Sequence, residues 1–232
     1  KFTYMSILWL HQPSETFQLS WDEEYNPPDH FHSEDGWLQA QFRDVILCSD
    51  SMHQQRSNAS SRVRPEAGAA IFRCTDMEFA NRADMFRELI GWISGDDTSG
   101  SYKVLAPILF RDYEGQMDKW KIFRNPILIR TYAALMLGPS SVKKAKGSDL
   151  YVRDTSHCNL ELIWGVRSVT PASIAASAIL ARFSASADNS FQPVGSVTGI
   201  AYQQDFEFYL KYLCEGLRTK KPSVISLFEE WN

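Results

Sequence analysis

Two residues of one N-terminal loop have the spacing of an iron-binding pair. His32 and Glu34 are separated by a single residue, and the distant His157 could supply a third ligand. Two imidazole nitrogens and one carboxylate oxygen, gathered on one face of an iron ion, leave positions open for oxygen and a cosubstrate. These three residues therefore form a candidate metal site, whose chemistry would be that of an iron-dependent enzyme.

An arginine near the third candidate ligand extends this pattern. Arg167 lies ten residues beyond His157, a separation that resembles the one between the last iron ligand and the oxoacid-binding arginine in 2-oxoglutarate oxygenases. Those enzymes build their site on β-strands, whereas residues 170–185 have a helical pattern, and short spacing patterns also arise by chance. A metal-dependent oxygenase is therefore the second alternative, and a polar surface loop is the simpler interpretation of the His32 segment.

A second candidate site is a basic segment in the middle of the chain. It contains Lys143, Lys144, Lys146 and Arg153, with Tyr151 between them. Because basic side chains bind phosphates and an aromatic ring can stack on a base, the segment predicts a contact with nucleic acid. The simpler interpretation is a solvated linker, since clusters of lysine usually form an exposed face.

The composition as a whole is that of an ordinary globular protein. The 232 residues are 44% hydrophobic and 22% charged, and the formal net charge of -4 argues against a surface built wholly for nucleic acid. The four cysteines lie far apart without a CxxC pair, which indicates reduced thiols and an intracellular protein, cytoplasmic or nuclear. The apolar run in residues 1–10 is too short to span a bilayer, so we expect no membrane segment.

Start and stop residues predict the helices that must position these groups. Thr75 followed by Glu78 is typical of a capping box, and an Asn-Pro or Thr-Pro pair is typical of a helix start. Gly95 and Gly138 are placed to end two of the helices. From these residues and the apolar periodicity we expect helices over residues 37–47, 76–94, 126–137, 171–185 and 202–217, and a short last helix capped by Ser223.

The sequence therefore predicts a mainly α fold. We expect a single helical domain over residues 37–232, with about six to eight helices, long connections and a polar loop near residues 49–70. Residues 1–36 are expected to form an extended or loop segment, whose pattern favours neither helix nor strand. Arg182 follows the alanine-rich face of its helix, so we expect it to form a structural ion pair rather than to act in catalysis.

Several sequence blocks carry a family resemblance. They read LMLGPSS at residues 135–141, WGVRSVTPASIA at 164–175, ARF at 181–183, TGIAYQQDFEFYL at 198–210 and WN at 231–232. In their order and spacing the chain, over residues 37–232, resembles a large uncharacterised domain family of mushroom-forming (basidiomycete) fungi. The resemblance implies a largely helical fold, and it implies no known activity.

These observations leave the function unknown and favour one interpretation of it. Apolar helix faces without a reactive cluster are typical of a non-enzymatic, intracellular binding or scaffolding module that needs no cofactor. Its partner would be another protein or a second copy of the chain. The first alternative is a nucleic-acid-associated accessory protein that uses the segment from Lys143 to Arg153, and the second is the oxygenase with His32, Glu34 and His157.

Overall fold

The computed structural model describes residues 57–95, 100–152, 160 and 166–232. The chain divides into two compact units, and nearly all of the described residues belong to the second, which covers Ala59–Asn232. The expected extended segment 1–36 and the expected helix over residues 37–47 lie outside the described residues. Within the second unit the fold is mainly helical, as the sequence predicts.

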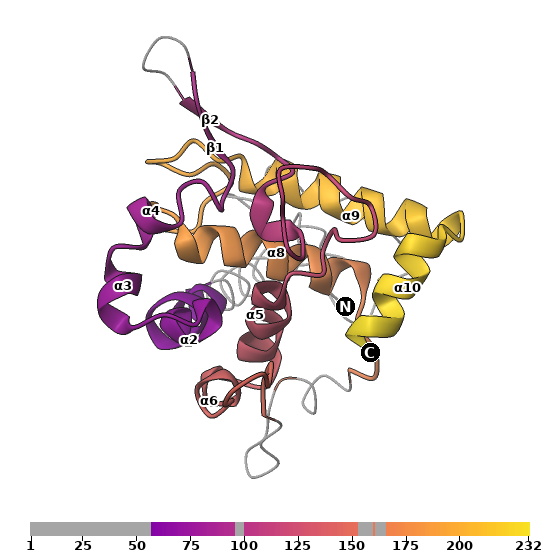
Figure 1. Ribbon diagram of the computed structural model, residues 1–232, viewed down its shortest axis with the longest axis horizontal. Helices are drawn as coiled ribbons and strands as arrows, with labels where there is room; N and C mark the ends of the chain where they lie inside the picture. Colours follow the sequence, from indigo (N-terminus) through magenta and orange to yellow (C-terminus); the bar gives the residue numbers. More distant parts are fainter. Residues whose placement is uncertain (1–56, 96–99, 153–159, 161–165) are drawn as a thin grey trace, which may run out of the picture. The chain divides into compact units, whose positions relative to one another are not determined.

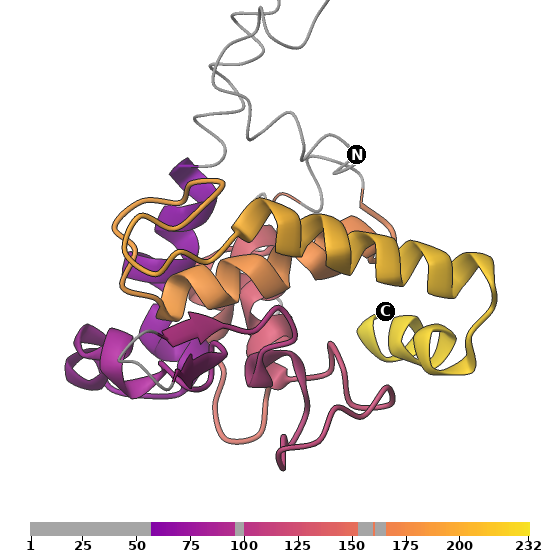
Figure 2. The same cartoon turned by 90° about the horizontal axis from the view of Figure 1, so that it is seen from above.

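Four longer helices form the body of this unit: α5 (Pro126–Met136), α8 (Pro171–Ala185), α9 (Tyr202–Arg218) and α10 (Pro222–Trp231). α8 and α9 lie side by side in opposite directions, and α5 crosses α8 (Figures 1 and 2). Every residue of α8 after Pro171 is buried. Its many alanines allow the neighbouring helices to approach closely, so α8 is the centre of the core.

Local capping explains where these helices begin. The Asn125 side chain accepts a hydrogen bond from the amide of Ile127 at 3.0 Å, directly before the helix that starts at Pro126. Thr170 and Ser173 form a reciprocal capping box at the start of α8. The two predicted starts are therefore confirmed, and so is the capping box of Thr75 with Glu78.

Shorter elements surround the four long helices. They are a π-helix η4 (Arg62–Glu66), the helices α2 (Gly68–Phe72), α3 (Asp76–Ala80), α4 (Arg82–Met85) and α6 (Pro139–Lys143), a 3-10 turn η5 (Pro107–Leu109), and the strands β1 (Trp92–Ser94) and β2 (Gly100–Tyr102). The strands pair antiparallel, with Trp92 opposite Tyr102. Eight α-helices lie wholly within the described residues, and residues 57–61 belong to a further helical segment, so the fold is mainly α as expected.

The expected polar loop near residues 49–70 is wrong over its described part. Residues 57–61 are helical, and η4 and α2 continue from them. Val63, Ala67 and Ile71 are at most 1% exposed, and their spacing of four places them on one helical face. This thin apolar stripe is enough to bury the segment, although serine and arginine dominate its composition.

The expected helix over residues 76–94 is correct only at its start. α3 ends at Ala80, α4 ends at Met85, and Gly91 then adopts a left-handed φ of 100°. A side chain at Gly91 would meet the carbonyl oxygen of Lys103 at 3.0 Å, so glycine permits the close turn into β1. The aromatic pair of Trp92 and Tyr102, with ring centroids 5.1 Å apart, then favours a hairpin over a longer helix.

The last helix is held by its own C-terminal residues. Glu230 forms ion pairs with Arg111 and Arg124, and the Trp231 indole donates to the carbonyl of Phe123 at 3.0 Å. The expected cap at Ser223 is wrong, because α10 begins one residue earlier at Pro222, and Ser223 is buried within its first turn. A proline is suited to the first helical position because it has no amide to satisfy there.

We expect Ile179→Asp to unfold the second unit. Ile179 is 0% exposed in the middle of α8, and an unpaired carboxylate buried there would cost several kcal/mol. Urea denaturation followed by circular dichroism measures the effect. The matched control is Ile225→Asp on α10, where 36% exposure lets water solvate the charge; a loss of similar size in both variants would contradict the placement of α8.

Candidate functional site

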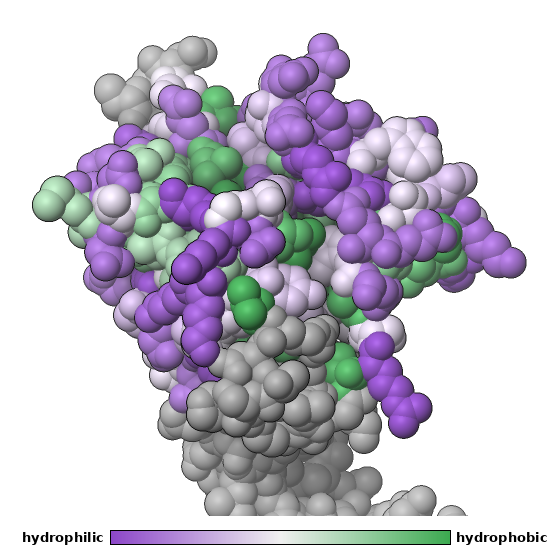
Figure 3. Space-filling model, turned by 60° about the horizontal axis from the view of Figure 1, so that its bottom comes forward, coloured by the Kyte–Doolittle hydropathy of each residue, from purple (hydrophilic) through white to green (hydrophobic). Residues whose placement is uncertain are grey.

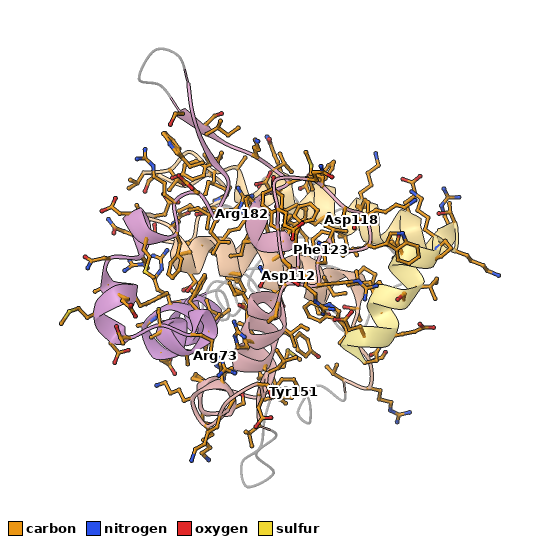
Figure 4. The ribbon with its side chains drawn as sticks, viewed as in Figure 1. Arg73, Asp112, Asp118, Phe123, Tyr151 and Arg182 are labelled. Atoms are coloured by element: carbon orange, nitrogen blue, oxygen red, sulfur yellow. The ribbon has the colours of Figure 1, made fainter. Side chains whose placement is uncertain are left out.

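Three of the four predicted nucleic-acid contacts lie in the described residues. Lys143, Lys144 and Lys146 are exposed at and just after the C-terminal end of α6. Arg73 reaches the same segment and donates hydrogen bonds to the carbonyls of Gly147, at 3.0 Å, and of Asp149 (Figure 4). Arg153 lies outside the described residues, so the structure brings three lysines and a fourth cation, Arg73, to one segment.

The candidate iron ligands His32, Glu34 and His157 all lie outside the described residues. Within the described ranges, no group of three or more histidine, cysteine, aspartate or glutamate residues could hold a metal ion. The metal site therefore stays a prediction.

An open pocket of about 990 Å³ lies where η4, α2 and α3 meet. Its apolar lining comes from small residues of α2 and from the rings of Phe79 and Phe183. Its charged lining comes from Arg64, Glu66, Asp76, Arg82 and Lys143. The sequence alone does not indicate this pocket, since its lining residues lie up to 129 positions apart in the chain, from Ser60 to Asn189; Lys143 is the one predicted site residue that it includes.

One wall of the pocket is an arginine whose two terminal nitrogens are engaged within the protein. The Arg64 guanidinium donates hydrogen bonds to the carbonyls of Phe183 and Asp188 and, at 3.1 Å, to the hydroxyl of Ser186. Its central carbon also lies 3.7 Å from the centre of the Phe183 ring. Arg64 therefore ties η4 to the C-terminal end of α8 and shapes the wall, while its donors face the protein.

Asp188 in turn fixes the loop that follows α8. Its carboxylate accepts hydrogen bonds from the amides of Val197 and Thr198, at 2.8 and 3.0 Å, and from the Tyr202 hydroxyl at 2.7 Å. Burial alone would raise the pKa of Asp188, but these hydrogen bonds to its ionised form outweigh burial, and its pKa lies below the ordinary value. The loop after α8, which contacts Arg64 of the pocket wall, thus depends on the ionised carboxylate of Asp188.

The charges around α2 are mainly positive and repel one another. Burial and then the nearby charge of Arg82 lower the pKa of Arg64 to about 10. Burial and then Arg73 likewise lower the pKa of Arg130 to about 10, on the other side of α2. Among the described residues Arg64, Arg82 and Lys143 form no ion pair. The pocket lining therefore carries three cations and two carboxylates, which is one positive formal charge in excess.

The aromatic wall of the pocket depends on a glycine. A side chain at Gly68 would place its first carbon 2.1 Å from the Phe79 ring, so only glycine lets the start of α2 lie against that ring.

Figure 3, which brings the lower side of Figure 1 forward, shows mostly hydrophilic side chains with hydrophobic ones between them. The pocket shares this mixture of polar and apolar chemistry.

Arg182 is a fully buried charge near the C-terminal end of α8. Its fully buried guanidinium pairs with Asp205 and donates to the carbonyls of Ile90, at 3.1 Å, and Lys103, at 2.9 Å, as well as to the Tyr209 hydroxyl at 3.2 Å (Figure 4). Burial raises the pKa of Asp205, and the attraction of Arg182 opposes that rise. The expected structural ion pair at Arg182 is confirmed.

The chain belongs to DUF6698, a family of unknown function, whose model matches residues 64–232. The match includes every element of the pocket from Arg64 onward. It begins at residue 64, later than residue 37, from which the sequence blocks indicate a resemblance. A search of curated proteins and a search of solved structures each found no match.

We expect Arg182→Met to destabilise the unit by about 3–5 kcal/mol, because it leaves Asp205 buried without its partner and the two carbonyls without their donor. Urea denaturation measures this loss. Arg87→Met is the matched control: Arg87 is exposed and stacks on Trp92, 3.9 Å from the ring centre, so its loss should cost less than about 1 kcal/mol. Equal losses would show that Arg182 contributes little beyond packing.

We also expect Asp188 to make stability depend on acid pH. Because its folded pKa lies below the unfolded value of about 3.9, its contribution is complete above that value and is lost as the pH falls through the folded pKa. The free energy of unfolding, measured in urea between pH 7 and pH 3, should therefore fall more steeply in the native chain than in Asp188→Asn. Parallel pH curves would contradict this role.

Proposed function

We propose that this domain is a non-enzymatic binding module and that a segment of a partner protein occupies the pocket formed by η4, α2 and α3. The observation that carries the proposal is the pocket itself. Its volume of about 990 Å³ is at the upper end of the usual range for ligand sites, and its lining combines aromatic rings with charged groups. Arg82 and Lys143 form no ion pair with a described residue, so a ligand would supply their counter-charge.

The mixed lining supports a protein partner over nucleic acid. Glu66 and Asp76 lie in the same pocket as Arg82 and Lys143, and the carboxylates would repel the phosphates of a nucleic acid. A polypeptide can place apolar, acidic and basic side chains at separate positions and so match both signs of charge. The partner would be another protein or a second copy of this chain.

A nucleic-acid-associated role is the second candidate, and a specific observation favours it. Lys143, Lys144 and Lys146 lie together at an exposed helix end, and Arg73 holds the backbone of the same segment. Cations gathered at one place attract phosphate without the need for a pocket. This candidate would use the outer side of α6 rather than the interior of the pocket.

We further infer that the protein works inside the cell, in the cytoplasm or the nucleus, and that its family is one of mushroom-forming fungi. The free thiols of Cys74 and Cys214 support the first inference, and the blocks at residues 135–141, 164–175 and 198–210 support the second. No helix within the described residues has both the length and the apolar character needed to cross a bilayer.

Selection of peptides from a random display library tests the proposed function. We expect the native protein to enrich a set of peptides that bind Ala80→Trp at least about tenfold more weakly, since an indole at this exposed pocket residue would fill the site. Affinity is measured by fluorescence anisotropy. The control is Lys211→Trp, which adds the same indole to the exposed side of α9; failure to enrich any peptide, or equal binding to Ala80→Trp, would contradict the proposal.

A further inference from the structure

We propose that the partner segment is acidic, with carboxylates that face Arg82 and Lys143 and an apolar side chain that lies against Phe79. This inference rests on the proposed function, and it names the chemical class of the ligand.

The first argument is the state of Arg82. Its guanidinium lies 5.7 Å from the centre of the Phe79 ring, in the lining of the pocket. It forms no ion pair with any described residue. Arg82 therefore lacks a counter-charge among the described residues, and a carboxylate that enters the pocket beside Phe79 would supply one.

Repulsion between the two arginines of the pocket is the second argument. The terminal nitrogens of Arg64 donate to carbonyls at the end of α8. Arg64 therefore contributes positive charge to the pocket rather than a hydrogen bond to the ligand. Arg82 lies close enough to lower the pKa of Arg64, which means that the two charges disfavour each other in the free protein. A bound anion would offset that repulsion, and part of its affinity would come from this relief.

The shape of the lining is the third argument. Ala69 and Ala70 present no long side chains to the pocket, so a ligand can approach this part of α2. Phe79 and Phe183 supply apolar surface in the same space. Acidic residues separated by apolar ones would therefore match the lining, whereas a nucleic acid, with one charge at every nucleotide, would also meet Glu66 and Asp76.

A defined peptide tests the inference. The probe is a fluorescein-labelled peptide of twelve residues built from glutamate, leucine and glycine, and its matched control carries glutamine in place of every glutamate. We expect the acidic peptide to bind the native protein at least about tenfold more tightly than its control, with affinity that falls as salt rises. Arg82→Gln and Lys143→Gln should each weaken binding by about three- to tenfold, while Lys211→Gln on α9 should not change it.

Thermal unfolding of each variant is measured alongside, because a variant that melts near the native temperature keeps its fold. Equal binding of the glutamine peptide, or unchanged binding to a folded Arg82→Gln variant, would overturn the inference. Tighter binding of a twelve-nucleotide single-stranded DNA than of the acidic peptide would overturn it in favour of nucleic acid. If display peptides depend on Ala80 but are neutral or basic, the proposed function stands and the acidic ligand is wrong.

Discussion

The buried charge of Arg182 is the constraint on which the arrangement of the helices depends. Its guanidinium connects α8 to Asp205 and Tyr209 of α9 and to backbone carbonyls at both ends of the hairpin segment. A charge in a core is stable only when nearly all of its donors have partners. These segments must therefore meet at one point, and their meeting fixes the separation of α8 from α9.

The same C-terminal end of α8 also supports the pocket. The carbonyl of Phe183 and the hydroxyl of Ser186 accept hydrogen bonds from Arg64 of η4. The Asp188 carboxylate orders the loop that leads to α9. The pocket wall is thus assembled from residues that lie 119 to 124 positions apart in the chain. Its geometry follows from the position of α8, and the charge of Arg64 in its wall is held in place by contacts with α8 and with the loop after it.

How much the sequence could predict follows from the range of the interactions. The helix starts at Thr75, Asn125 and Thr170 depend on hydrogen bonds within three residues, so the local sequence predicts them. The end of the helical segment at Met85 depends on the pairing of Trp92 with Tyr102. The local sequence pattern does not predict that pairing, because the two residues are ten positions apart. Val63, Ala67 and Ile71 did carry a helical signal, but polar neighbours obscured it. The pocket could not be foreseen, because the contacts of Arg64 are all distant in sequence.

The enclosure of α8 has a consequence for the motions of the protein. A helix with buried residues around its whole circumference has no side from which water can reach its amides. Hydrogen exchange along α8 therefore requires α5 and α9 to separate from it, so that this exchange reports the opening of the entire helical body rather than fraying of one segment.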